Sequence, residues 1–423
     1  MESTPSPYFP RDDPNTSILP SLETRHVGLL SSESSYADFN GLSYSNLFGI
    51  GTTLFVVVSI VNTETTDKRL EMRFYSQKTL NPVSSKALVL PSDTLNPIHA
   101  GTGSEGIAFD EKNQRLYVFQ VRFSRLWCIK DCLTAPSIAY ATGFSRPPGY
   151  YIGDVRLDTE AGAIVALWWR GSRRDPQLVV YSTSSGVEVE RFEINPYFLE
   201  TADQYLNYHY HTHYPPQYVF VNNPDTGRVH IVFIAHPHFH YLRSIEIPFL
   251  QDGTRIDHDR LAREADQSLQ IDYPDLFKDR LRYPSSFELV MLHNNEYLIQ
   301  YRQQSVVHQN SLDFCYLTPP DRHGKRRAYL TTLDFDGHEV YNRYFRTMYW
   351  LPMGRRLLIT GITEKILVVP LQLLYSRPWD PSNHHESSAQ TRRAVEALTF
   401  VNDLGPEARR LPPEMLFEIF SWL

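Results

Sequence analysis

The chain has 423 residues, of which 42% are hydrophobic and 13% aromatic, so it can form a packed core and is not a disordered protein. Its 48 acidic and 41 basic residues are dispersed and give a net charge of −7, which leaves no basic face of the kind that nucleic-acid-binding proteins need. The three cysteines are an odd number and suit a reducing compartment, so we expect a cytoplasmic or nuclear protein.

The N-terminal segment 1–25 is rich in Pro and Ser and has no apolar run of the kind that a signal peptide contains, so we interpret it as a disordered tail. The most hydrophobic stretch follows at Leu47–Val61. It is shorter than the ~20 residues of a membrane helix and is rich in β-branched residues. It therefore predicts a buried strand.

Residues 26–376 consist of short strand-like runs separated by turn residues, with almost no helical periodicity. The clearest unit begins at Tyr151 and contains four runs: YIGDVRLDTEAG, AIVALWWRG, PQLVVYSTSSG and VEVERFEI. Four consecutive strands over about forty residues are typical of one propeller blade.

Similar units recur in the segments 47–79, 104–130, 217–248, 285–345 and 346–375. In 285–345 the predicted strands are FELVMLH, EYLIQYRQ, RRAYLTTLDF and HEVYNRYF. We predict a mainly β fold, a degenerate β-propeller of about six or seven blades, with a pair of β-sandwiches as the alternative. A linker at 377–387, a helix at 388–405 and a second helix at 411–423 form a short C-terminal helical appendix.

Two histidine-rich runs are the candidate metal ligands: His209, His211 and His213, and His236, His238 and His240. In a strand, alternate residues point to the same face, and imidazole binds zinc, copper or iron. The alternative is that Tyr and His alternate across a half-buried strand with the tyrosines inward. We adopt this alternative and predict no cofactor.

GTGSEG, at Gly101–Gly106, has the spacing of a dinucleotide-binding loop, but strands follow it where that motif requires a helix. We interpret it as a loop entering a blade. Glu105 with Gly106 is similar to the early Glu-Gly of calcium-dependent propeller lactonases, which makes a lactonase-like enzyme one alternative. Cys128 and Cys132 are predicted to pack in the core. The sequence contains no nucleophile elbow, zinc-protease motif or P-loop, so we expect a protein without catalytic activity.

The last thirteen residues, LPPEMLFEIFSWL, predict a helix that is apolar on most sides. Prolines at 412 and 413 suit a first helical turn. Glu414, Glu418 and Ser421 share one narrow strip, and apolar side chains cover the rest of the surface. Such a helix needs partners on more than one side.

This motif resembles the first helix of an F-box, whose pattern is close to L-P-x-E-hydrophobic-L-x-x-I-F-x-x-L. The matching residues are Leu411, Pro412, Glu414, Met415, Leu416, Ile419, Phe420 and Leu423. An F-box, once its later helices complete it, docks on the Skp adaptor of a cullin–RING ubiquitin ligase, while another domain holds a protein substrate. The resemblance implies adaptor contacts through Leu411, Pro412, Glu414, Leu416, Ile419, Phe420 and Leu423. We therefore expect a substrate receptor of this ligase. The alternatives are a propeller enzyme or metal-binding protein, and a scaffold with no ligase role.

Overall fold

A computed structural model describes most of the chain between Arg25 and Leu371. The segments it does not describe are 1–24, 29–34, 38–46, 63–67, 91–104, 121–123, 147–148, 171–173, 195–196, 198–216, 235–241, 252, 268–283, 304–310, 319–327, 335–346, 361–365 and 372–423. The predicted linker, the helix at 388–405, the motif Leu411–Leu423 and both histidine-rich runs lie outside the described residues.

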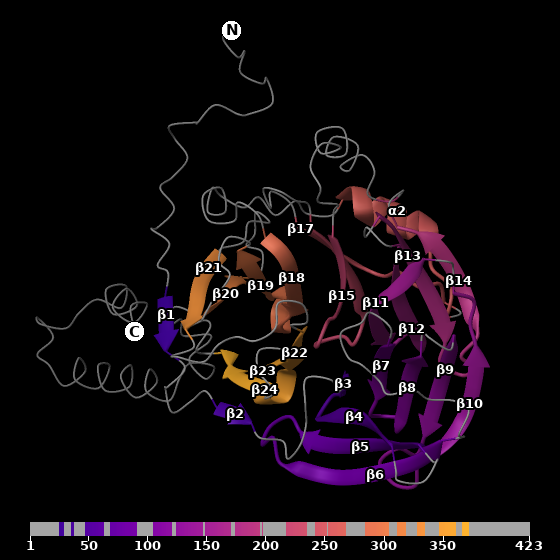
Figure 1. The fold of residues 1–423 in the computed structure, drawn as a ribbon. Coiled ribbons are helices and arrows are strands. Elements are labelled where there is room, and N and C mark those ends of the chain that lie inside the picture. The colour runs from indigo at the N-terminus through magenta and orange to yellow at the C-terminus, as the bar shows by residue number, and fades with distance from the viewer. Residues whose placement is uncertain are drawn as a thin grey trace, which may run out of the picture.

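The described strands form six sheets arranged as a ring, so the fold is mainly β and of the propeller type (Figure 1). Three sheets are four-stranded meanders in chain order. They contain β3 (Leu47–Ile50), β4 (Leu54–Asn62), β5 (Lys68–Ser76) and β6 (Pro82–Leu90); β7 (Glu105–Asp110), β8 (Arg115–Gln120), β9 (Arg125–Lys130) and β10 (Ser137–Gly143); and β11 (Tyr150–Asp158), β12 (Ala163–Arg170), β13 (Arg174–Ser182) and β14 (Glu188–Glu193). We call them blades 1, 2 and 3.

Blades 4 to 6 complete the ring. Blade 4 has three strands, β15 (Gln217–Asn222), β16 (Val229–Ile234) and β17 (Leu242–Glu246). Blade 5 contains β18 (Pro284–Met291), the short helix η3 (His293–Asn295), β19 (Tyr297–Gln303), β20 (Ser311–Leu317) and β21 (Ala328–Asp334). Blade 6 contains β22 (Thr347–Leu351), the short helix η4 (Pro352–Gly354), β23 (Arg356–Thr360) and β24 (Ile366–Pro370).

The inner strands close the ring. Each of β3, β7, β11, β15, β18 and β22 contacts the next in this order, and β22 contacts β3. The N-terminal part of the chain adds the outermost strands of the last two blades. β1 (Arg25–Gly28) pairs parallel with β21, and β2 (Ser35–Ala37) pairs antiparallel with β24. The prediction of six or seven blades is confirmed, and the described residues form six.

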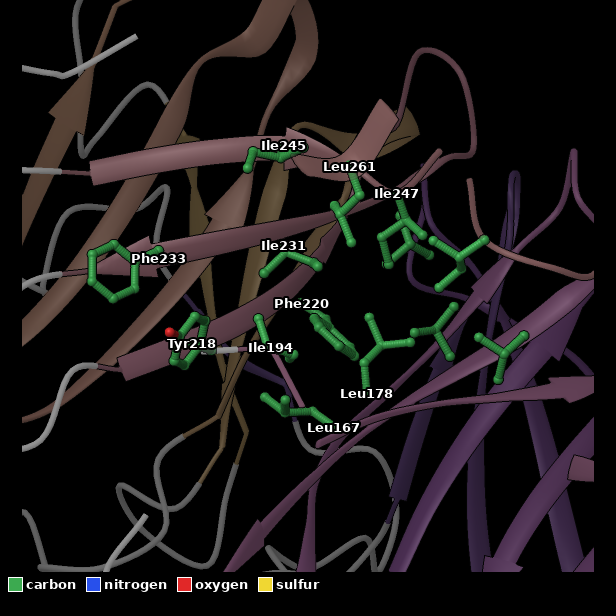
Figure 2. Close-up of a cluster of buried hydrophobic side chains, with 14 of the residues drawn as sticks. Leu167, Leu178, Ile194, Tyr218, Phe220, Ile231, Phe233, Ile245, Ile247 and Leu261 are labelled. Carbon is green, nitrogen blue, oxygen red and sulfur yellow. The ribbon is translucent and has the colours of Figure 1, made fainter. Parts of the chain in front are cut away.

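The core lies between neighbouring blades, because both faces of a blade are covered. In β4, Val56 and Val58 pack with residues of blade 2, whereas Phe55 and Val57 pack with residues of blade 6. This explains the unbroken apolar run, which is expected for a strand buried on both faces. Figure 2 shows the same arrangement between blades 3 and 4, where Leu167 and Leu178 face Phe220 and Ile231.

The prediction of one buried strand over Leu47–Val61 is wrong in one respect, because the chain makes a turn within this stretch. The backbone N–H of Gly51 donates to the carbonyl of Leu54 (2.9 Å), and the stretch divides into β3 and β4. A Cβ on Gly51 would lie 2.5 Å from a carboxylate oxygen of Glu111 and 2.9 Å from the Phe109 ring. The tight approach of blade 2 therefore requires glycine at this turn.

Two further predictions need correction. In blade 5 the third strand is β20, which the sequence reading missed, while the predicted strand HEVYNRYF lies outside the described residues. A helix, α2 (His258–Gln267), occupies a region where no helix was expected. The Asp257 carboxylate accepts the backbone N–H of Arg260 (2.9 Å) at the start of this helix. Leu261 and Ala265, one turn apart, are buried against blades 3 and 4.

Polar contacts between neighbouring blades involve the turns that follow the inner strands. Glu111 of blade 2 accepts the backbone N–H groups of Thr53 (2.8 Å) and Leu54 (3.0 Å) of blade 1. The Met353 N–H of blade 6 donates to the side chain of Gln77 in blade 1 (3.2 Å). Asp225 of blade 4 contacts His293 Nδ1 of blade 5 (2.6 Å). These contacts hold neighbouring blades in register.

Candidate functional site on the inner strands

Charged side chains occupy the inner strands at the centre of the ring. On β11, the carboxylate of Asp154 lies 2.8 Å from Nη1 of Arg156. Both residues are only partly exposed, at 16% and 27% of their side chains. Because β11 is the inner edge of blade 3, this ion pair lies where several blades approach one another.

The ion pair also contacts the inner strand of blade 4. The Arg156 guanidinium donates from Nε to the Phe220 carbonyl (3.2 Å), and the backbone of Phe220 hydrogen-bonds to Asp154. In the opposite direction, Asn222 Nδ2 donates to the carbonyl of Leu157 (2.7 Å). An inner strand has backbone groups that its own sheet leaves unpaired, and these contacts satisfy several of them.

Burial raises the pKa of Asp154 to about 6, although Arg156 and the backbone hydrogen bonds from Val155 and Phe220 act in the opposite direction. A carboxyl group with such a pKa changes charge close to neutral pH. Perturbed carboxyl groups in the interior of a fold are candidates for functional groups, although ion-pair networks produce them too. Asp154 therefore marks the inner strands at the centre of the ring as the candidate site within the described residues.

Tyr349 on β22 and Glu288 on β18 belong to the same electrostatic cluster. Burial raises the pKa of Tyr349, Arg156 lowers it, and the negative charges of Glu288 and Asp154 raise it further. The Tyr349 ring packs against Phe48 on β3, with ring centroids 5.0 Å apart. Inner strands of blades 1, 3, 5 and 6 thus contribute to one cluster, which combines an acid, a cation and a phenol.

None of these four residues was singled out from the sequence. The signal available was the Asp-x-Arg spacing in YIGDVRLD, which places two opposite charges on one face of an otherwise apolar strand. No comparable local signal exists for Glu288 and Tyr349, since their proximity to Asp154 depends on the closure of the ring.

The other predicted site residues are placed as follows. Cys128 and Cys132 are fully buried, and burial raises the pKa of both thiols, that of Cys132 to about 12, which confirms that they pack in the core. Glu105 begins β7, so GTGSEG does lead into a blade and no helix follows it. The described residues contain no group of three His, Cys, Asp or Glu side chains that could hold a metal ion. No helix in the described part is long and apolar enough to cross a membrane.

The segments that contain the six candidate histidines join the described strands at one end of blade 4. The first run precedes Gln217, and the second connects Ile234 to Leu242. The register pairs Gln217 with Ile234 and Ile234 with Leu242. The two histidine-rich segments are therefore attached to three neighbouring positions of one sheet.

No protein-family model matches the chain, and no curated protein matches it. Among solved structures it is similar to the β-propeller domain of Cps50 (Swd1) from Myceliophteria thermophila, at 10% identity and a TM-score of 0.40, over 80% of this chain and 99% of that chain. It is also similar to regucalcin, a calcium-binding protein from Agrobacterium tumefaciens, at 8% identity and a TM-score of 0.40, over 82% and 95% of the two chains. Similarity to hydrazine synthase from Kuenenia stuttgartiensis has 10% identity and a TM-score of 0.38, over 77% of each chain. These TM-scores carry no argument about function, and the propeller assignment rests on the six sheets and their closure.

Proposed function

We propose that the protein is a non-catalytic, F-box-type substrate receptor of a cullin–RING ubiquitin ligase. In this mechanism the propeller holds a protein substrate, and the C-terminal segment contacts the Skp adaptor of the ligase. The protein performs no chemistry itself. It raises the local concentration of the substrate near the ubiquitin-loading machinery.

The observation that carries the proposal is the motif Leu411–Leu423, in which residue type and spacing both agree with the first helix of an F-box. A short helix that is apolar on most sides must bury those sides against other surfaces. The propeller supports the second half of the proposal, because a closed ring of blades is a rigid body on which loops can form a binding surface. Propellers serve many functions, so the fold alone does not select this one.

The proposal predicts that two charges in the apolar part of the motif abolish adaptor binding. Leu416→Asp combined with Ile419→Asp would place carboxylates in the predicted contact, where their desolvation is unfavourable. We expect retention of the full chain on immobilised Skp adaptor to fall by at least about tenfold. The measurement is a pull-down with both purified proteins.

The matched control puts the same side chains on the polar strip of the motif, as Glu418→Asp with Ser421→Asp. This variant should be retained like the wild type. Equal recovery of the Leu416→Asp/Ile419→Asp variant would contradict the adaptor contact. A wild-type chain that is not retained at all would contradict the proposal as a whole.

Metal binding is the second candidate function, because the register of blade 4 brings the attachment points of both histidine-rich segments together. If they form one site, protein purified without a histidine tag should contain about one zinc, copper or iron ion per chain by elemental analysis. His211→Ala with His238→Ala should lose that ion. His293→Gln, in blade 5, is the control and should keep it. Wild-type protein without stoichiometric metal after incubation with zinc would exclude this function.

A further inference from the structure

The outer edges of the six blades differ in how they are protected. The outermost strand of a sheet presents unpaired N–H and C=O groups, which other strands can bind. Blades 5 and 6 end in the very short strands β1 and β2. In blade 4, β17 contacts helix α2. In blade 3, β14 has four charged residues among six. In blade 2, β10 contacts a turn of blade 3 through Tyr140 and Thr142, whose hydroxyls donate to Thr183 (3.0 Å) and Ser185 (2.7 Å).

Strand β6 of blade 1 has none of these protections among the described residues. It is nine residues long, and no described strand pairs with its outer side (Figure 1). Val83 and Val89 are exposed at 57% and 56%, and Ser85 and Ala87 between them are exposed too. These four side chains alternate along the strand and therefore share one face. On this face β6 itself carries no charged side chain, and a long free edge of this kind favours the addition of another strand.

The charge around β6 indicates which kind of strand would add to its edge. Between residues 68 and 90 there are five basic residues and one acidic residue, in a chain whose net charge is −7. Arg69 is exposed and lies opposite Val89 in the register, and Glu71 is paired with Arg73 at 3.3 Å. An acidic strand is attracted to this surface. A second copy of the chain would bring two sets of these cations together, so it fits less well.

We infer that the outer edge of β6 binds an extended acidic peptide segment of a partner protein, which adds to blade 1 as a fifth strand. Main-chain hydrogen bonds to β6 provide the general affinity, and β-branched or apolar side chains at alternate positions pack against Val83 and Val89. Acidic residues between them point to the opposite face, on which Lys86 lies, and the other cations of β5 and β6 add to the attraction. The inference stands apart from the adaptor proposal, because β6 and the C-terminal motif are altered by different variants.

The test uses a fluorescent ten-residue peptide of alternating Glu and Val, blocked at both ends, and measures its anisotropy with the full chain at physiological salt. We expect saturable binding that weakens by about tenfold or more in the Val83→Asp/Val89→Asp variant, which removes both apolar pairs and adds like charge opposite the peptide. Val187→Asp is the matched control, since Val187 is also exposed, at 52%, but lies outside β6. It should bind like the wild type.

Three outcomes would overturn the inference. The first is no binding of the peptide to the wild-type chain, or equal binding to the Val83→Asp/Val89→Asp variant. The second is that a peptide of alternating Lys and Val binds as tightly as the Glu/Val peptide, which would show that charge does not determine which peptide binds. The third is that the wild-type chain sediments as a dimer and the Val83→Asp/Val89→Asp variant as a monomer. That result would show that the edge of β6 binds a second copy of the chain. A folding defect is excluded when each variant has the same midpoint of thermal unfolding as the wild type.

Discussion

Replacing Asp158 with alanine is expected to lower the free energy of unfolding by about 3–5 kcal/mol, because two backbone N–H groups and a guanidinium lose their shared acceptor. The Asp158 side chain is fully buried between blades 3 and 4. It accepts hydrogen bonds from the backbone N–H groups of Ala161 (2.8 Å) and Val229 (3.0 Å) and from Arg228 Nε (3.1 Å). Alanine would leave these donors without their acceptor. Urea unfolding followed by tryptophan fluorescence measures the loss.

Glu264→Ala is the control for removing an acidic side chain from an ion pair. Glu264 pairs with Arg260 at 2.6 Å on the surface of α2, and both side chains are at least a third exposed. Such a helical pair contributes only about 0.3–0.5 kcal/mol, so the control should unfold almost like the wild type. A loss below about 1 kcal/mol for Asp158→Ala would contradict the view that this carboxylate holds blades 3 and 4 together.

The parts of the fold that the sequence predicts well are those in which strand and turn signals are both local. Blade 3 was predicted as four runs from Tyr151, and the observed strands begin at Tyr150, Ala163, Arg174 and Glu188. Its turns are rich in Gly, Ser and Asp, which separate the runs clearly. Outer strands such as β6 and β10 were not predicted, because they are only half-buried and the apolar pattern in PVSSKALVL and SIAYATG is faint.

What the sequence could not provide is pairing between distant segments. Nothing local in RHVG or SYA indicates that these short runs complete blades 5 and 6. The same limit applies to the candidate site. Asp154 and Arg156 lie in a strand that was predicted, but their proximity to Tyr349 follows from the contact between blades 1 and 6 that closes the ring. Helix α2 was missed because its apolar face consists mainly of Leu261 and Ala265 in a highly charged segment.

Asp154 should make the stability of the protein depend on pH between about pH 4 and pH 6. Its pKa in the folded protein is about 6, above the ordinary value of 3.8, chiefly because of burial. The folded state therefore binds this proton more tightly than the unfolded state does. The resulting contribution to stability is complete below about pH 4 and is lost as the pH rises through about 6. At about 1.4 kcal/mol per pH unit, the difference amounts to about 3 kcal/mol.

The Asp154→Asn variant isolates this contribution, because its side chain does not titrate. We expect the wild type to lose about 2.5 kcal/mol relative to this variant when unfolding is measured at pH 7 and at pH 4. Glu160→Gln removes one exposed carboxylate from the turn that follows β11 and controls for the change in net charge. It should not reproduce the difference. The opposite result is that the free energy of unfolding changes with pH in the same way for the wild type and for Asp154→Asn between pH 4 and pH 7. In that case solvent or the charge of Arg156 keeps Asp154 ionised over this range. Asp154 and Arg156 would then form a permanent ion pair, whose role would be to join blades 3 and 4.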